Sequence, residues 1–183
     1  LRVLLYKGGF FKEITALKMF FNSFVMATGV ALLSVITSLM AAYALVYYRT
    51  KYATFLFWLI FITILVPLEL RIFPTYSVMA KLNLVNSYFG LIVPISASAI
   101  ATLFFRQFYR TVPDELLESA KLDGASTWRF FIDFLVPLSR TMIVAMFIFM
   151  FVFGYNQYLW PLLVTSSEQY WTVVMGLKMM SGS

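Results

Sequence analysis

The 183-residue sequence contains neither cysteine nor histidine. Their absence excludes disulfides, thiolate or imidazole metal sites, Ser-His-Asp triads and haem held by His or Cys. Charge is also scarce, because Asp, Glu, Lys and Arg make up 12% of the residues, whereas about a quarter is usual in a soluble domain. The sequence therefore lacks the polar residues that a soluble domain needs on its surface, and it lacks the usual catalytic groups of membrane enzymes.

The eight glycines form no G-x-x-x-x-G-K-S/T loop, so the chain does not bind ATP by that route. Energy for active transport has to come from another subunit or from an ion gradient. The net charge is +6, but the basic residues are scattered singly, which disfavours nucleic acid as a partner. No internal repeat or shift in composition marks a second domain, so we expect one membrane domain over residues 1–183.

Long apolar runs are what the sequence does contain, with 62% hydrophobic and 19% aromatic residues. A helix needs about 20 apolar residues to cross a bilayer, because every backbone group must be bonded inside the helix. The apolar runs are continuous rather than alternating, which is typical of helices. We predict membrane-spanning helices near Phe21–Tyr48, Ala53–Ala80, Tyr88–Arg110 and Leu138–Trp160.

The distribution of basic residues hardly discriminates between the two orientations in the membrane. If residues 111–137 face the cytoplasm, seven basic residues lie inside, namely Arg49, Lys51, Arg106, Arg110, Lys121, Arg129 and Arg140. Outside are Arg2, Lys7, Lys12, Lys18, Lys81 and Lys178, with Arg71 at the outer end of a helix. The short turn Arg49–Lys51 favours this orientation, but the decision rests on the polar segment 111–137.

Residues 111–137 form a polar segment between two apolar runs, and its residues predict two short helices around a glycine hinge. Thr111 and Ser126 are suited to cap the two helices, Pro113 suits a first turn, and Gly124 ends the first helix. An apolar stripe at i, i+3, i+4 and i+7 follows, formed by Trp128, Phe131, Ile132 and Leu135, and Pro137 closes the element. A solvated loop is the alternative, but Leu116, Leu117 and Ala120 beside acids favour a docking surface.

The segment also resembles a known signature. Glu118-Ser119-Ala120, three residues, Gly124, nine residues and Phe134-Leu135-Val136-Pro137 match the spacing of E-A-A-x3-G-x9-I-x-L-P, the signature of permease subunits of bacterial ATP-binding cassette (ABC) importers. The departures are Ser119 for Ala, Phe134 for Ile and Val136 for Leu. The stretches 67–75, 103–126 and 155–163 resemble the carbohydrate-type permeases, and the likeness runs from about Asn22 onward.

The resemblance implies an all-α, polytopic bundle of the ABC importer permease (MetI-like) type in the bacterial cytoplasmic (inner) membrane. The four helices here correspond to the second to fifth of the family's six, so we expect the first and last to lie outside this sequence. It implies a transport subunit without enzymatic activity or cofactor. The implied partners are a second permease subunit in a heterodimer, two copies of a cytoplasmic ATPase, an extracytoplasmic substrate-binding protein and membrane lipid.

In that family the loop forms a coupling helix in a groove of the ATPase. The resemblance thus implies ATPase-coupling roles for Glu118, Ser119, Ala120, Asp123, Gly124 and Pro137. Glu118 and Asp123 offer acids to the groove, and Gly124 permits the sharp turn. Sugar and glycerol-phosphate permeases share these motifs, so we expect the path to carry sn-glycerol-3-phosphate or a related sugar.

Polar groups inside the apolar runs are candidates for the substrate path. An ionised group at mid-membrane costs about 2.5 to 3.5 kcal/mol, and a straight helix from Ala53 places Arg71 roughly 27 Å along its axis. Glu69 and Arg71 therefore either snorkel to the outer headgroups or line a water-filled path that Pro67 and Pro74 open. Near the end of the fourth run are Asn156, Gln157 and Tyr158, which fit either an interfacial belt or a substrate site.

Two other classes of protein compete with an importer permease. A secondary transporter or channel subunit couples through intramembrane acids or shows inverted repeats, yet only Glu69 is available and no repeat is visible. A purely structural membrane subunit does not need the polar segment at this spacing.

Overall fold

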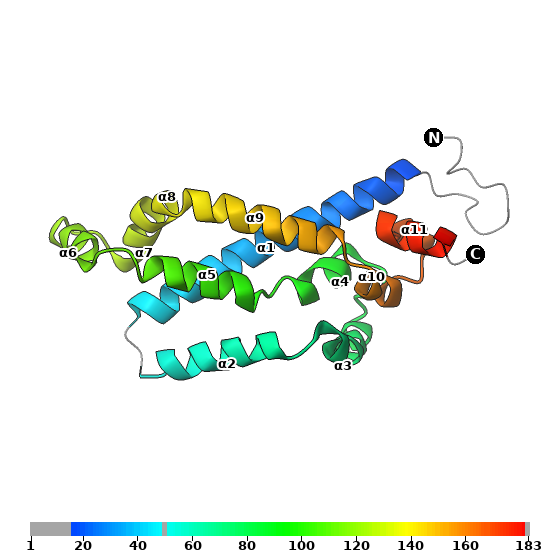
Figure 1. Ribbon diagram of the computed structural model, residues 1–183, viewed down its shortest axis with the longest axis horizontal. Coiled ribbons are helices and arrows are strands. Elements are labelled where there is room, and N and C mark those ends of the chain that lie inside the picture. Colours follow the sequence, from blue (N-terminus) through cyan, green and yellow to red (C-terminus); the bar gives the residue numbers. More distant parts are fainter. Residues whose placement is uncertain (1–15, 49–50, 182–183) are drawn as a thin grey trace. The chain divides into compact units, whose positions relative to one another are not determined.

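The computed structural model describes residues 16–48 and 51–181, and all the regular elements in these ranges are helices (Figure 1). The described residues form two compact units that interleave along the chain. The first unit comprises residues 16–32, 68–96 and 149–181, and the second comprises 33–67 and 97–148. The single domain over residues 1–183 stays a prediction.

Helix α1 (Ala16–Tyr47) confirms the first predicted span. It carries no proline and no charge after Lys18, so nothing interrupts its backbone hydrogen bonds within the apolar run. Its buried residues recur as adjacent pairs every four residues, which places them along one side of the helix. They are Asn22, Ser23, Met26, Ala27, Val30 and Ala31 in the first unit, and Ser34, Val35, Ser38, Leu39, Ala42 and Tyr43 in the second.

The other three predicted spans are broken rather than straight. Helix α2 (Ala53–Leu65) is followed by α3 (Leu68–Lys81), and α4 (Tyr88–Ile92) with the 3₁₀ turn Val93–Ile95 is followed by α5 (Ala99–Tyr109). The fourth run holds α9 (Arg140–Tyr155) and then α10 (Leu159–Val164). One helix of the described chain is long and apolar enough to cross a membrane, or up to four spans if each bent pair counts as one. The bent pair that contains α9 joins it to the helical segment Thr127–Leu138 before it, and not to α10.

The breaks have local causes that a count of apolar residues does not register. Pro67 has no N–H for a helix, and α2 ends two residues before it. Pro94 lies in the 3₁₀ turn that ends the α4 segment, and Ser98 restarts the helix because its Oγ accepts a hydrogen bond from the Ala101 N–H at 3.1 Å. Pro74, in contrast, lies inside α3.

The first unit is held together by buried polar contacts. Asn22 Nδ2 donates to the carbonyls of Gln169 and Trp171, both at 2.9 Å, and its Oδ1 accepts from the Tyr88 hydroxyl at 2.7 Å. These bonds join α1 and α4 to the segment between α10 and α11 (Val173–Ser181), which includes the 3₁₀ turn Glu168–Tyr170. The Trp160 indole donates to the Gly90 and Leu91 carbonyls at 3.1 and 3.2 Å. Helices α3 and α4 both pack on α10.

The second unit has an apolar core between α1, α5 and the helices of the polar segment. Its buried members are Val35, Leu39, Ala42, Tyr43, Ala101, Phe105, Tyr109, Ala120, Phe130, Phe131, Leu135 and Met146. Ser38 Oγ donates to the Ser98 carbonyl at 3.2 Å and accepts from Thr102 Oγ1 at 3.2 Å, which joins α1 to α5. Small side chains and hydroxyls of this kind allow membrane helices to approach closely.

Candidate coupling and transport sites

The first predicted helix of the polar segment is α6 (Asp114–Leu122). Pro113 is its N-cap residue, and the first turn carries Asp114 and Glu115, whose negative charge favours the positive end of the helix dipole. The predicted cap by Thr111 is wrong, because the Thr111 hydroxyl instead donates to the Phe108 carbonyl at 2.7 Å. Thr111 therefore completes the end of α5 rather than the start of α6.

Gly124 ends α6 in a Schellman motif. Its φ is +76°, and its N–H donates to the Lys121 carbonyl at 3.0 Å, while the Ala125 N–H donates to the Ala120 carbonyl at 2.9 Å. The left-handed backbone strains any residue with a Cβ. A Cβ placed on Gly124 has no heavy atom within 4 Å, so the need for glycine here is conformational and not a matter of space. The predicted glycine hinge is confirmed.

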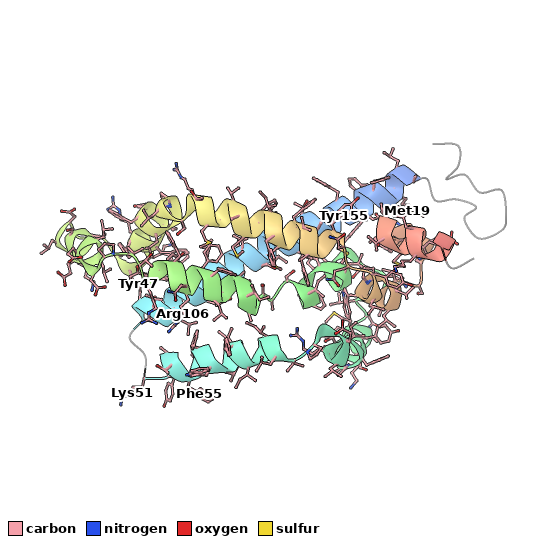
Figure 2. The ribbon with its side chains drawn as sticks, viewed as in Figure 1. Met19, Tyr47, Lys51, Phe55, Arg106 and Tyr155 are labelled. Atoms are coloured by element: carbon pink, nitrogen blue, oxygen red, sulfur yellow. The ribbon has the colours of Figure 1, made fainter. Side chains whose placement is uncertain are left out.

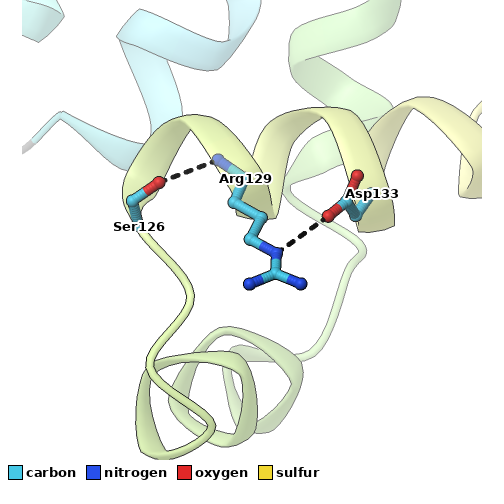
Figure 3. A network of polar contacts seen from close by, with 3 residues as sticks. All are labelled: Ser126, Arg129 and Asp133. Carbon is cyan, nitrogen blue, oxygen red and sulfur yellow. Dashed lines mark hydrogen bonds and ion pairs between the residues drawn. The ribbon is translucent and has the colours of Figure 1, made fainter.

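The second helix, α7 (Thr127–Phe130), begins as predicted at Ser126, whose Oγ accepts from the Arg129 N–H at 3.2 Å. Arg129 Nε lies 3.2 Å from Asp133 Oδ2, and both side chains are exposed (Figure 3). An exposed pair of this kind contributes at most about 1 kcal/mol. The helix continues through the π-helical turn Phe131–Leu135 into α8 (Val136–Leu138), one residue beyond Pro137.

The predicted apolar stripe is wrong as a single face. Phe131 and Leu135 are buried in the core of the second unit, whereas Trp128 and Ile132 are exposed. Phe131 and Leu135 lie one turn apart along one edge of the stripe, and Trp128 and Ile132 lie one turn apart along the other edge, so the core covers only one edge.

The predicted coupling residues differ in accessibility. Glu118, Ser119, Asp123 and Gly124 are exposed, and Pro137 is partly buried. Ala120 has only 1% of its surface exposed and packs in the core, so it lies on the inner side of α6. The outer side of α6 carries Glu115, Glu118 and Leu122 at i, i+3 and i+7, which fall on one helix face. Leu122 is 88% exposed at the end of that row.

The structure also shows an apolar hollow of about 110 Å³ beside α6. It is lined by Val112, Leu116, Phe130, Phe134, Leu135 and Leu138. Sequence reasoning missed this hollow, because its two rows at i, i+4 spacing, Val112 with Leu116 and Phe130 with Phe134 and Leu138, meet only through packing. Figure 1 shows α6, α7 and α8 together at one end of the second unit.

The five candidates for the substrate path all belong to the first unit. Glu69 and Arg71 are exposed on α3. The prediction that Arg71 lies on a straight helix from Ala53 is wrong, because that helix breaks at Pro67. The distance along the chain therefore does not give the depth of Glu69 and Arg71 in the membrane. Tyr158 is the N-cap residue of α10 and packs against the cluster of Trp171 and Met175.

The amides of Asn156 and Gln157 bond to the end of their own helix. Asn156 Nδ2 donates to the Val152 carbonyl at 2.9 Å, and Gln157 Nε2 donates to the Phe153 carbonyl at 3.4 Å. The Val152 carbonyl also accepts from the Asn156 backbone N–H at 3.1 Å, so both side chains fold back onto the last turn of α9. Within the described ranges no hydrogen bond or ion pair joins these amides to Glu69 or Arg71, although α3 and α10 pack together.

The basic residues Arg2, Lys7, Lys12 and Arg49, which entered the orientation count, lie outside the described residues. Groups of His, Cys, Asp and Glu that could hold a metal ion are absent from residues 16–48 and 51–181.

A helical membrane chain with an exposed, glycine-hinged helix pair between two apolar segments is the architecture of a transport permease. Residues 34–182 match the family of binding-protein-dependent transport system inner membrane components, and the chain belongs to this family. The chain is 50% identical over 165 residues to the sn-glycerol-3-phosphate transport system permease protein UgpE of Yersinia enterocolitica, which covers 90% of this chain and 59% of that protein. To the UgpE protein of Agrobacterium fabrum it is 47% identical over 163 residues, covering 89% and 58%.

A solved structure shares the fold. The chain matches the crystal structure of a bacterial ABC transporter involved in the import of the acidic polysaccharide alginate with a TM-score of 0.81 and 17% identity, over 93% of this chain and 59% of that one. The predicted all-α permease fold and the predicted membership of the importer permeases are confirmed. So is the inner membrane location of the family. The chain spans about three fifths of the length of these relatives.

Proposed function

We propose that the chain is the membrane-spanning permease subunit of an ABC importer for sn-glycerol-3-phosphate or a related sugar. The observation that carries this proposal is the outer row of α6, which consists of Glu115, Glu118 and Leu122. Leu122 is 88% exposed, and the helix that presents the row ends in a Schellman motif. An apolar side chain so exposed beside acids favours docking to a partner. The relatives named as sn-glycerol-3-phosphate permeases support the substrate.

The partner at α6 is a separate cytoplasmic ATPase that supplies basic or amide groups to Glu118 in the outer row and to Asp123 at the end of the helix. The ATPase is present in two copies, the permease pairs with a second permease subunit, and a binding protein delivers substrate on the opposite side. Because the polar segment docks to the ATPase, it lies in the cytoplasm.

Contacts within the second unit give the route by which motion of α6 reaches the membrane helices. Ala120 on the inner side of α6 packs in the core with residues of α1 and α5. The Tyr43 hydroxyl on α1 donates to the Thr127 carbonyl at the start of α7 at 2.6 Å. Closure of the ATPase pair moves α6, and this packed core transmits the movement to α1 and α5 as rigid elements.

The substrate path runs along the first unit, past Glu69, Arg71, Asn156, Gln157 and Tyr158. Arg71 is the contact for the phosphate, because a guanidinium binds phosphate with two parallel hydrogen bonds. The amides of Asn156 and Gln157 keep a carbonyl oxygen each to accept from substrate hydroxyls, since their N–H groups are engaged by α9.

Uptake by the reconstituted transporter tests this proposal. We expect proteoliposomes that hold the full-length permease with its partner subunits to take up sn-glycerol-3-phosphate only with ATP inside and binding protein outside. Arg71→Gln raises KM about tenfold through loss of the charge-assisted bonds to phosphate. The control Lys81→Gln, at the other end of α3, leaves KM unchanged.

Uptake that an ion gradient drives without the ATPase contradicts the importer function and favours a secondary transporter. An unchanged KM in Arg71→Gln, with ATP-driven uptake intact, contradicts only the role of Arg71 and indicates that it snorkels to the headgroups.

A further inference from the structure

The end of the second unit where α5 finishes and α2 begins carries a cation, Arg106, that has no counterion among the described residues. The guanidinium carbon of Arg106 lies 3.9 Å from the centre of the Phe57 ring on α2. Its Nε is buried and has no hydrogen-bond partner among the described residues. The side chain as a whole remains partly exposed, and the part of the chain that the structure describes provides no carboxylate partner for it.

The neighbouring charges are also positive. Arg110 lies one helical turn beyond Arg106 and is exposed, and Lys51 is exposed two residues before α2 begins. Figure 2 shows Arg106 and Lys51 at this end of the unit. These three basic side chains make the local potential positive, although Asp114 at the start of α6 lies close enough to act on Tyr47, whose hydroxyl donates to the Tyr109 carbonyl.

The stacking on Phe57 orients Arg106 but does not neutralise it. A cation-π contact is worth about 0.5 to 2 kcal/mol, whereas a partly buried charge needs a partner of opposite sign. The contact holds the planar guanidinium against α2, so the N–H donors of Arg106 keep one orientation. Arg106 is thus preorganised for an anion with several acceptor oxygens.

The surface beside this cation is apolar. Helix α2 has no buried residue, and Phe55, Leu56, Trp58, Leu59 and Ile62 are all exposed along it. A soluble anion leaves this surface uncovered. A phospholipid covers it with acyl chains while its phosphate reaches Arg106, so one ligand satisfies both features.

We propose that Arg106, assisted by Lys51 and Arg110, binds the phosphate of an anionic phospholipid whose acyl chains lie along α2. Guanidinium groups bind phosphate bidentately, and basic positions between membrane helices recognise lipid headgroups. The site belongs to the second unit and uses none of the candidates for the substrate path. It therefore stands independently of the proposed transport function.

Lipid titration of the purified full transporter in detergent, read by native mass spectrometry, tests the site. We expect the wild type to retain phosphatidylglycerol in preference to phosphatidylcholine. Arg106→Gln raises the Kd for phosphatidylglycerol about tenfold, equivalent to about 1.4 kcal/mol. Arg106→Lys gives a smaller loss, because it keeps the charge but not the planar fork. The control Arg140→Gln, an exposed arginine at the start of α9, leaves the Kd unchanged.

Three results overturn the proposal. Phosphatidylcholine binds as tightly as phosphatidylglycerol, or Arg106→Gln binds like the wild type, or Arg140→Gln loses as much affinity as Arg106→Gln. A competition experiment distinguishes a lipid phosphate from a soluble one. Inorganic phosphate or sn-glycerol-3-phosphate is added at millimolar concentration to the lipid-bound wild type and to Arg106→Gln. Displacement of the lipid from the wild type alone shows that the site binds a soluble phosphate instead. Thermal unfolding of each variant, with Arg106→Lys as the second folded variant, separates lost binding from lost folding.

Discussion

At the scale of single residues, the first unit depends on a few hydrogen bonds between amide side chains and groups of distant segments. Asn22 is fully buried and bonds three groups, from α4 and from the segment before α11. Asn86 has φ +58°, and its Oδ1 accepts from the Ser166 and Ser167 N–H groups at 2.7 and 2.9 Å. Each unsatisfied group costs several kcal/mol inside a membrane, so such amides fix irregular segments in place.

Gly90 shows how closely these segments approach. A Cβ on Gly90 clashes with the Leu84 carbonyl oxygen, which belongs to the backbone and cannot rotate away. We predict that Gly90→Ala lowers the free energy of unfolding by about 3 kcal/mol, because the loop must shift and the Gly90 carbonyl leaves the Trp160 indole. The measurement is thermal unfolding in detergent, with tryptophan fluorescence as a second signal.

Gly29→Ala is the matched control for this substitution. A Cβ on Gly29 lies 2.6 Å from Ile92 Cδ1, the far end of a flexible side chain that can rotate. Alanine also favours a helix over glycine by about 1 kcal/mol, so we expect little net change. Equal losses of stability in the two variants contradict the argument from backbone contact.

At the scale of elements, the polar segment is built from three local devices in sequence. Acids stand at the start of α6, a Schellman motif ends it, and Ser126 caps α7. The Schellman motif and the Ser126 cap satisfy backbone groups that a helix end leaves free, and the acids complement the helix dipole, so the pair of helices holds its shape outside the apolar spans. The same devices present Glu115, Glu118 and Leu122 on the outer side while Ala120 faces the core.

The hinge gives a prediction at this scale. Gly124→Val places a β-branched residue at φ +76° and costs about 1 to 2 kcal/mol, which the chain relieves by reorienting α6. We expect ATP-driven uptake to fall at least about tenfold while the amount of protein in the membrane stays normal, measured by immunoblot. Gly124→Asn retains most of the uptake, because asparagine tolerates the left-handed region. Normal uptake by Gly124→Val refutes the role of the hinge.

At the scale of the whole molecule, the sequence predicts what depends on neighbours along the chain. The helix pair of residues 111–137, the glycine between its helices and the cap at Ser126 depend on local hydrogen bonds, and these predictions are confirmed. The all-α fold depends on long apolar runs, because a membrane leaves few other structures possible.

The features that the sequence does not predict depend on packing or on exceptions to regular helices. The break after Ile95 occurs inside an apolar run, so hydropathy passes over it, whereas Pro67 does predict the opening after Leu65. No spacing predicts the π-helical turn Phe131–Leu135, and packing decides that only the edge of the predicted stripe formed by Phe131 and Leu135 is buried. The stacking of Arg106 on Phe57 joins residues from separate helices, and no spacing in the sequence indicates it.

Nucleotide-dependent crosslinking of α6 tests the coupling of this chain to a separate ATPase most directly. The sequence has no native cysteine, so Leu122→Cys provides a single thiol at an exposed position. In inner membrane vesicles with the full transporter and single-cysteine ATPase variants, we predict a crosslink whose yield changes when ATP binds. The control Leu82→Cys, exposed after α3, gives no crosslink. Two results contradict the coupling of this chain to a separate ATPase through α6. In one, the thiol at residue 122 reacts only from the periplasmic side, and in the other it crosslinks equally with and without nucleotide.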